Sequence, residues 1–121
     1  MRKMLLLSTL MLFISISAFS ARLNLSLTSL GSGFGDATYD AATKTITYPA
    51  GWGGKGWWLG SVDYSAYDHV VVKFNAADSR VQVVIEYNNS IASTTVGVDA
   101  GVTTITAALD AAGKASVKQI Y

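Results

Sequence analysis

Short segments of alternating apolar and polar residues recur along most of this chain and constrain its fold more than any other feature. Stretches rich in glycine, asparagine, aspartate and serine, which favour turns, separate these segments. Alternation with a period of two indicates a strand with one buried face, and several such strands in succession indicate an antiparallel sandwich. The pattern is found at residues 43–48, 69–74, 81–87, 94–98, 103–107 and 116–121. The sequence therefore predicts an all-β fold, an antiparallel β-sandwich or jelly roll.

The longest alternating segment, residues 81–87, also predicts which side chains face the core. The inward set is Val81, Val83, Ile85 and Tyr87, and the outward set is Gln82, Val84 and Glu86. Residues 39–45 contain a turn sequence beginning at Asp40 and predict a hairpin. The alanine-rich residues 107–114 predict a short helix that Gly113 ends.

The N-terminus has the pattern of a secretory signal peptide. The basic pair Arg2 and Lys3, the apolar residues 4–13 and the small-residue site at 18–20 predict a signal peptide over residues 1–20. The apolar stretch is too short for a membrane span. We therefore expect a protein that is secreted, or held in the periplasm or at the cell surface.

The mature chain, residues 21–121, is long enough for one domain with a single core. It stops within the predicted strand at residues 116–121, with no polar tail. An apolar half-strand at a terminus leaves an unpaired edge, which natural domains avoid. The sequence therefore predicts that this domain is truncated at its C-terminus.

Missing residue types exclude several classes of function. The chain has no cysteine, which excludes disulfides, zinc thiolate sites and thiol nucleophiles, and its only histidine is His69. It has no G-x-S-x-G motif and no recognisable pair of catalytic carboxylates. Removing two of the nine basic residues with the signal peptide leaves seven against eight acidic residues, a net charge near −1. We therefore expect a bacterial extracellular binding protein, with no enzymatic activity and no nucleic-acid partner.

All three tryptophans lie in the glycine-rich residues 51–60. Neighbouring side chains of an extended segment point to opposite faces, so we expect Trp57 to face the core and Trp58 to face outward. An outward tryptophan on a soluble protein usually has a partner. Trp58 and the loop residue Trp52 are therefore predicted to form a platform for a sugar ring, with Lys55 as a hydrogen-bond donor. The alternative is that the tryptophans fill the core.

Polar residues on the predicted central strand form a second candidate set. Gln82, Glu86 and Asn88 share its outward face and could form hydrogen bonds with sugar hydroxyls. A face that is simply in contact with solvent explains the same three residues at least as well.

Aspartates in predicted turns could hold a structural calcium ion, because calcium prefers oxygen ligands. The candidates are Asp36, Asp40 and Asp99. Aspartate is also a frequent turn residue, and turn formation is the favoured explanation for these three. We expect no other cofactor.

The stretch from residue 39 to 74 resembles the small jelly-roll, galactose-binding-like carbohydrate-binding modules of secreted bacterial proteins. The resembling motifs are Gly56-Trp57-Trp58-Leu59-Gly60, then Asp63-Tyr64-Ser65-Ala66-Tyr67-Asp68, then the strand at residues 69–74. The resemblance implies a non-catalytic module that binds a neutral polysaccharide or oligosaccharide and is associated with a glycoside hydrolase domain or protein. A structural or adhesion β-sandwich that contacts proteins, with its tryptophans in the core, is the alternative function.

Overall fold

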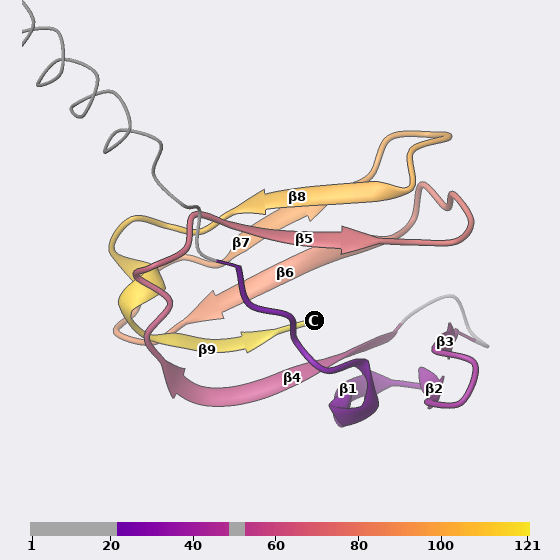
Figure 1. Ribbon diagram of the computed structural model, residues 1–121, viewed down its shortest axis with the longest axis horizontal. Coiled ribbons are helices and arrows are strands. Elements are labelled where there is room, and N and C mark those ends of the chain that lie inside the picture. Colours follow the sequence, from indigo (N-terminus) through magenta and orange to yellow (C-terminus); the bar gives the residue numbers. More distant parts are fainter. Residues whose placement is uncertain (1–21, 49–52) are drawn as a thin grey trace, which may run out of the picture.

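The computed structural model describes residues 22–48 and 53–121, and in these ranges the chain is an all-β protein with antiparallel sheets packed together (Figure 1). The larger sheet has the strand order β1-β4-β9-β6-β7. Its members are β1 (Ser32–Gly35), β4 (Gly53–Val62), β9 (Val117–Ile120), β6 (Gln82–Tyr87) and β7 (Thr94–Gly97). The predicted all-β sandwich is confirmed. The predicted signal peptide lies outside the described residues.

Two smaller sheets complete the fold. The strands β5 (His69–Lys73) and β8 (Thr104–Ala108) pair with each other, and their side chains cover one face of the larger sheet. The strands β2 (Thr38–Asp40) and β3 (Thr45–Thr47) form the hairpin that the sequence predicted. Two short 3-10 helices complete the described elements: η1 (Leu27–Ser29) precedes β1, and η2 (Gly113–Ala115) lies between β8 and β9.

The core lies between the larger sheet and the β5–β8 pair. Val83, Ile85 and Tyr87 of β6 belong to the buried cluster, and Val81 packs against it. The inward face predicted for residues 81–87 is therefore confirmed. From the other layer, Ile105 and Ala107 of β8 close the core.

A β-bulge in β9 decides which of its side chains are buried. Tyr87 pairs with Val117 and Glu86 pairs with Gln119, so Lys118 is an extra residue opposite β6. Simple alternation would send Val117 and Ile120 to opposite faces. The bulge turns both of them inward, where they are 0% and 1% exposed.

The predicted helix over residues 107–114 is wrong. Ala107 pairs with Val70 in the β5–β8 sheet and is completely buried. After β8 the Asp110 carboxylate accepts hydrogen bonds from the backbone N–H groups of Ala112 and Gly113, which forms a turn before η2. Strand pairing and core burial thus override the helix propensity of the alanines. Within the described residues, no helix is long and apolar enough to cross a membrane.

Candidate ligand-binding face

Trp57 and Trp58 point to opposite faces of β4, as strand alternation predicted. Trp57 packs against the core, and its indole Nε1 donates a hydrogen bond to the carbonyl oxygen of Ser26 at 2.9 Å. Trp58 lies on the outer face of the larger sheet and is 62% exposed. The inward and outward predictions for this pair are confirmed. Trp52, the other half of the predicted platform, lies outside the described residues.

Strand pairing places polar side chains beside Trp58. Trp58 of β4 pairs with Gln119 of β9, and Gln119 pairs with Glu86 of β6. Residues directly opposite one another in paired strands point to the same face. The bulge residue Lys118 joins them, with its Nζ atom 5.4 Å from the centroid of the Trp58 ring. We call these four side chains, Trp58, Lys118, Gln119 and Glu86, the Trp58 row.

Glu86 holds the polar part of the Trp58 row in place. Its Oε2 accepts a hydrogen bond from Gln119 Nε2 at 2.7 Å, and its Oε1 accepts one from the Tyr121 hydroxyl at 2.9 Å. Lys118 Nζ lies 3.8 Å from Oε2. Burial and then this hydrogen bond to Glu86 raise the pKa of Tyr121. Glu86 therefore orients its neighbours, whereas Lys118 and Trp58 are the members best placed to meet a ligand.

Sequence reasoning missed Lys118, Gln119 and Tyr121. Their position depends on the β9 bulge, which simple alternation does not predict. A signal was nevertheless present, because the apolar residues Val117 and Ile120 are three positions apart and flank a polar pair. Such a break in alternation is typical of a bulge.

The structure does not bring the remaining predicted site residues to the Trp58 row. Lys55 is two positions from Trp57 and therefore lies on the opposite face of β4 from Trp58. The Asn88 amide donates to the Gly60 carbonyl at 2.8 Å and to Ser116 Oγ at 3.0 Å, so it ties neighbouring segments together. Gln82 shares the outward face of β6 with Glu86 but lines a pocket nearer the other end of the strand.

Aromatic side chains of this chain occupy the space beside two glycines of the tryptophan segment. A Cβ on Gly54 would lie 2.8 Å from Phe34 Cζ, and one on Gly56 would lie 2.6 Å from Tyr121 Cβ. The Phe34 and Tyr121 rings meet edge to face, with centroids 5.2 Å apart. These glycines therefore allow β1 and Tyr121 to pack closely on β4, which accounts for them without a ligand.

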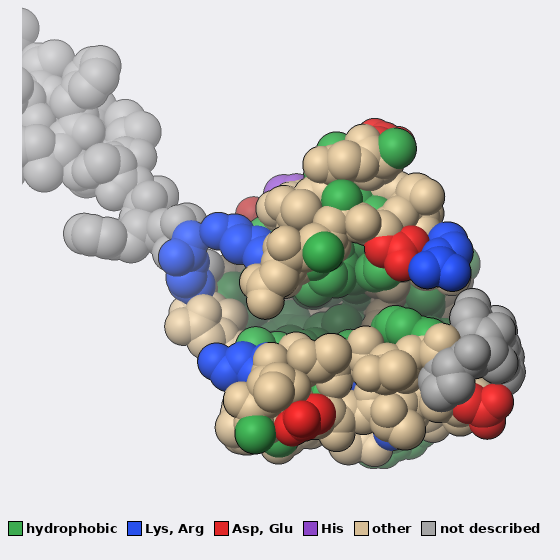
Figure 2. All heavy atoms as spheres, turned by 90° about the vertical axis from the view of Figure 1, so that its right-hand side faces the viewer, with side chains coloured by type: hydrophobic (Ala, Val, Ile, Leu, Met, Phe, Trp, Pro, Cys, Tyr) green, Lys and Arg blue, Asp and Glu red, His purple; other side chains and the backbone are tan. Residues whose placement is uncertain are grey.

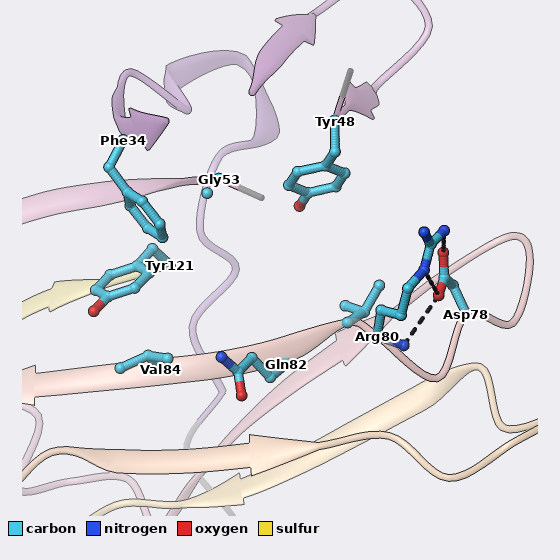
Figure 3. A pocket seen from close by; sticks show the side chains of 10 residues that line it. Phe34, Tyr48, Gly53, Asp78, Arg80, Gln82, Val84 and Tyr121 are labelled. Carbon is cyan, nitrogen blue, oxygen red and sulfur yellow. Dashed lines mark hydrogen bonds and ion pairs between the residues drawn. The ribbon is translucent and has the colours of Figure 1, made fainter. Parts of the chain in front are cut away.

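A pocket of about 300 Å³ lies beside this aromatic pair, between β4 and β6 (Figure 3). Its lining residues are Phe34 of β1, Gly53 and Gly54 of β4, Gln82 and Val84 of β6, and Tyr48, Asp78, Arg80, Val81 and Tyr121 from outside the strands. Figure 2 shows the molecule hollowed on this side, with hydrophobic side chains inside the hollow. We call this pocket the β4–β6 gap.

Asp78 and Arg80, which both line the β4–β6 gap, form an ion pair with each other. Arg80 Nη2 donates to Asp78 Oδ2 at 2.7 Å, and Arg80 Nε and the Arg80 backbone N–H both donate to Asp78 Oδ1 at 3.0 Å (Figure 3). These hydrogen bonds lower the pKa of Asp78 to about 2. Burial and then the charge of Asp78 raise the pKa of Tyr48 on the facing side.

Replacing Arg80 with alanine is expected to raise the pKa of Asp78 from about 2 toward its ordinary value of 3.8, because the guanidinium donors are lost. A lowered carboxyl pKa stabilises the fold above the ordinary pKa, and that contribution disappears as the pH falls toward 2. Both side chains are exposed, so we expect only a small effect on stability. Carboxyl NMR shifts followed against pH measure the change. Asp63, whose pKa is lowered by Ser65, is the internal control; an Asp78 midpoint that stays near 2 would contradict the expected role of Arg80.

The aspartates considered for calcium do not gather with other ligands. Among the described residues, no group of three or more His, Cys, Asp or Glu side chains could hold a metal ion. Asp40 instead accepts hydrogen bonds from the backbone N–H groups of Ala42 and Thr43 in the β2–β3 turn, which lower its pKa. This is the turn-forming role that the sequence favoured for it.

Comparison with known proteins identifies no family for this chain. No protein-family model matches it, and no curated protein and no solved structure matches it either.

Proposed function

We propose that the protein is a secreted, non-catalytic carbohydrate-binding module that recognises a neutral glycan through the Trp58 row. The observation that supports this proposal most is Trp58 itself, a large aromatic side chain that is 62% exposed on an ordered strand. A tryptophan face suits the apolar C–H patches of a sugar ring. Lys118 beside it can donate hydrogen bonds to the ring hydroxyls.

The chemistry of the Trp58 row fits binding better than catalysis. Glu86 is its one carboxylate, and both of its oxygens accept hydrogen bonds from neighbouring side chains. Glycoside hydrolysis usually needs two carboxyl groups placed across the scissile bond. The net charge near −1 of the predicted mature chain also favours a neutral partner. A glycoside hydrolase domain or protein is the associated partner that we propose.

Replacing Trp58 with alanine is expected to weaken glycan binding about thirtyfold, the effect of losing a central aromatic anchor worth about 2 kcal/mol. Affinity electrophoresis through gels containing single neutral polysaccharides measures the loss, after a glycan array has identified a bound sugar. We expect binding to be nearly independent of salt, since the ligand carries no charge. The same substitution should change the free energy of unfolding by about 0.5 kcal/mol or less, because Trp58 is exposed.

Val71→Ala is the matched control for this experiment. Val71 is also exposed, at 55%, but it lies on β5 in the other sheet. Migration of the wild type that does not depend on any polysaccharide would exclude the glycan proposal. The alternative, a structural or adhesion domain, would then be favoured, because the exposed apolar side chain of Val71 could contact a protein. In that case Val71→Ala would weaken the protein contact.

A further inference from the structure

Three aromatic side chains follow one another along the outer face of β4. Trp58 belongs to β4 itself, and Gly56 and Gly54 share its face because alternate residues of a strand point the same way. Tyr121 covers the outer side of Gly56. Phe34 pairs with Gly54 from β1, and its ring covers the outer side of that glycine. We call Trp58, Tyr121 and Phe34 the aromatic strip.

Contacts with Glu86 and between the rings hold the aromatic strip in place. The Phe34 and Tyr121 rings meet edge to face, at an interplanar angle of 81° (Figure 3). The Tyr121 hydroxyl donates to Glu86 Oε1, and Glu86 Oε2 lies 3.8 Å from the Lys118 ammonium, which is over the Trp58 ring. Glu86 is therefore connected to both ends of the aromatic strip.

The two ends of the aromatic strip are the parts that a ligand can best reach. Trp58 is 62% exposed and Phe34 is 40% exposed, whereas Tyr121 between them is half-buried. Gly54, the partner of Phe34, is four residues from Trp58 on β4, so the two ends lie about 13.6 Å apart along the strand. One sugar ring is too short to contact both ends, but a chain of several linked sugars can do so.

The path between the two ends is level and uncharged. Gly56 is the only β4 residue between Trp58 and Gly54 on this face, and it has no side chain. At the Trp58 end, the charges of Lys118 and Glu86 compensate each other. These features suit a neutral chain whose sugar rings place their C–H patches on aromatic side chains.

We propose that the aromatic strip binds a linear glycan along the direction of β4, with one sugar unit on Trp58 and another unit of the same chain on Phe34. This inference rests on the proposed glycan function. It adds Phe34 as a second contact, and it names the ligand class as an internal stretch of a linear polysaccharide, as opposed to a single terminal sugar. A chain lying across the strands would leave Phe34 and run toward β7, where Thr95 is exposed.

Oligomers of increasing length test the proposal. They are prepared, from the single sugar upward, from the neutral polysaccharide that retards the protein most in affinity gels, and isothermal titration calorimetry measures their binding. We expect the four-unit oligomer to bind about tenfold more tightly than the single sugar, because it gains the second aromatic contact. A single sugar that binds as tightly as the longer oligomers would overturn this inference and leave the glycan function standing. Failure of every polysaccharide to retard the protein would overturn both.

Phe34→Ala separates the two contacts. We expect this variant to bind the four-unit oligomer about tenfold more weakly and the single sugar as before, whereas Trp58→Ala should weaken the binding of both. Val102→Ala is the matched control, because Val102 is 41% exposed but lies in the turn that follows Asp99. It should change neither affinity. A Phe34→Ala variant that binds the four-unit oligomer like the wild type would contradict the second contact.

NMR titration of the unaltered ¹⁵N-labelled protein tests the same contact even if Phe34→Ala does not fold. We expect the four-unit oligomer to shift the amide signals of Phe34 and Gly54 together with that of Trp58. The single sugar should shift the signal of Trp58 and leave the other two in place. Shifts at Thr95 in place of Phe34 would mean that the chain crosses the strands, and this result would overturn the proposal.

Discussion

Replacing Gly56 with alanine is expected to lower the free energy of unfolding by about 3 kcal/mol. The added Cβ would lie 2.6 Å from the Tyr121 Cα and closer still to the carbonyl oxygen of Ile120. Both are backbone atoms, which cannot rotate away as the end of a flexible side chain can. β9 would have to move off β4, and the pairs that Trp57 and Trp58 make with it would weaken. Urea unfolding followed by tryptophan fluorescence measures the loss.

Gly97→Ala is the matched control for Gly56→Ala. Gly97 lies at the end of β7, and an added Cβ there would have no atom within 4 Å. We expect this change to alter the free energy of unfolding by about 0.5 kcal/mol or less. Equal effects of the two substitutions would mean that β9 and Tyr121 do not lie against Gly56 in solution. The sheet order around β9 would then need revision.

Replacing Ile85 with alanine is expected to lower the free energy of unfolding by about 4 kcal/mol. Ile85 is 0% exposed and sits in the middle of β6, where it pairs with Ile120 on one side and Thr94 on the other. Core residues of both layers surround it, so the cavity left by the lost atoms can close only in part. Circular dichroism during urea unfolding measures the effect, and a lower midpoint with an unchanged slope is the expected form.

Val71→Ala controls for the loss of an aliphatic side chain from a strand. Val71 lies on β5 and is 55% exposed, so its truncation leaves no cavity inside the protein. We expect a change of about 0.5 kcal/mol or less. A loss below about 1 kcal/mol for Ile85→Ala would contradict its place at the centre of the core. A large loss for Val71→Ala would show that the outer face of β5 is covered in solution.

Alternation predicted the faces of single strands well. The inward set of residues 81–87 and the opposite orientations of Trp57 and Trp58 follow from the pleat of one strand, which needs no knowledge of its neighbours. The same reasoning failed for residues 107–114. There, the helix preference of the alanines was weaker than the gain from pairing with β5 and from filling the core with Ala107.

The composition of the candidate site was predicted only in part. Trp58 and Glu86 were named from the sequence and lie in one row across the sheet. Lys55 was named because it is close to Trp58 in sequence, but residues three positions apart in a strand face opposite ways. Lys118 and Gln119 were missed because they come from a strand sixty residues away, which sequence spacing cannot place beside Trp58.

The sequence by itself determined the fold class and the faces of most strands, because both follow from local alternation and turn residues. Only the tertiary structure decided the rest, because strand order and the β9 bulge come from contacts between distant segments. Those contacts place Lys118 and Gln119 beside Trp58, and they set Phe34 and Tyr121 over the glycines of β4. They also leave the β4–β6 gap between two strands that are far apart in the chain.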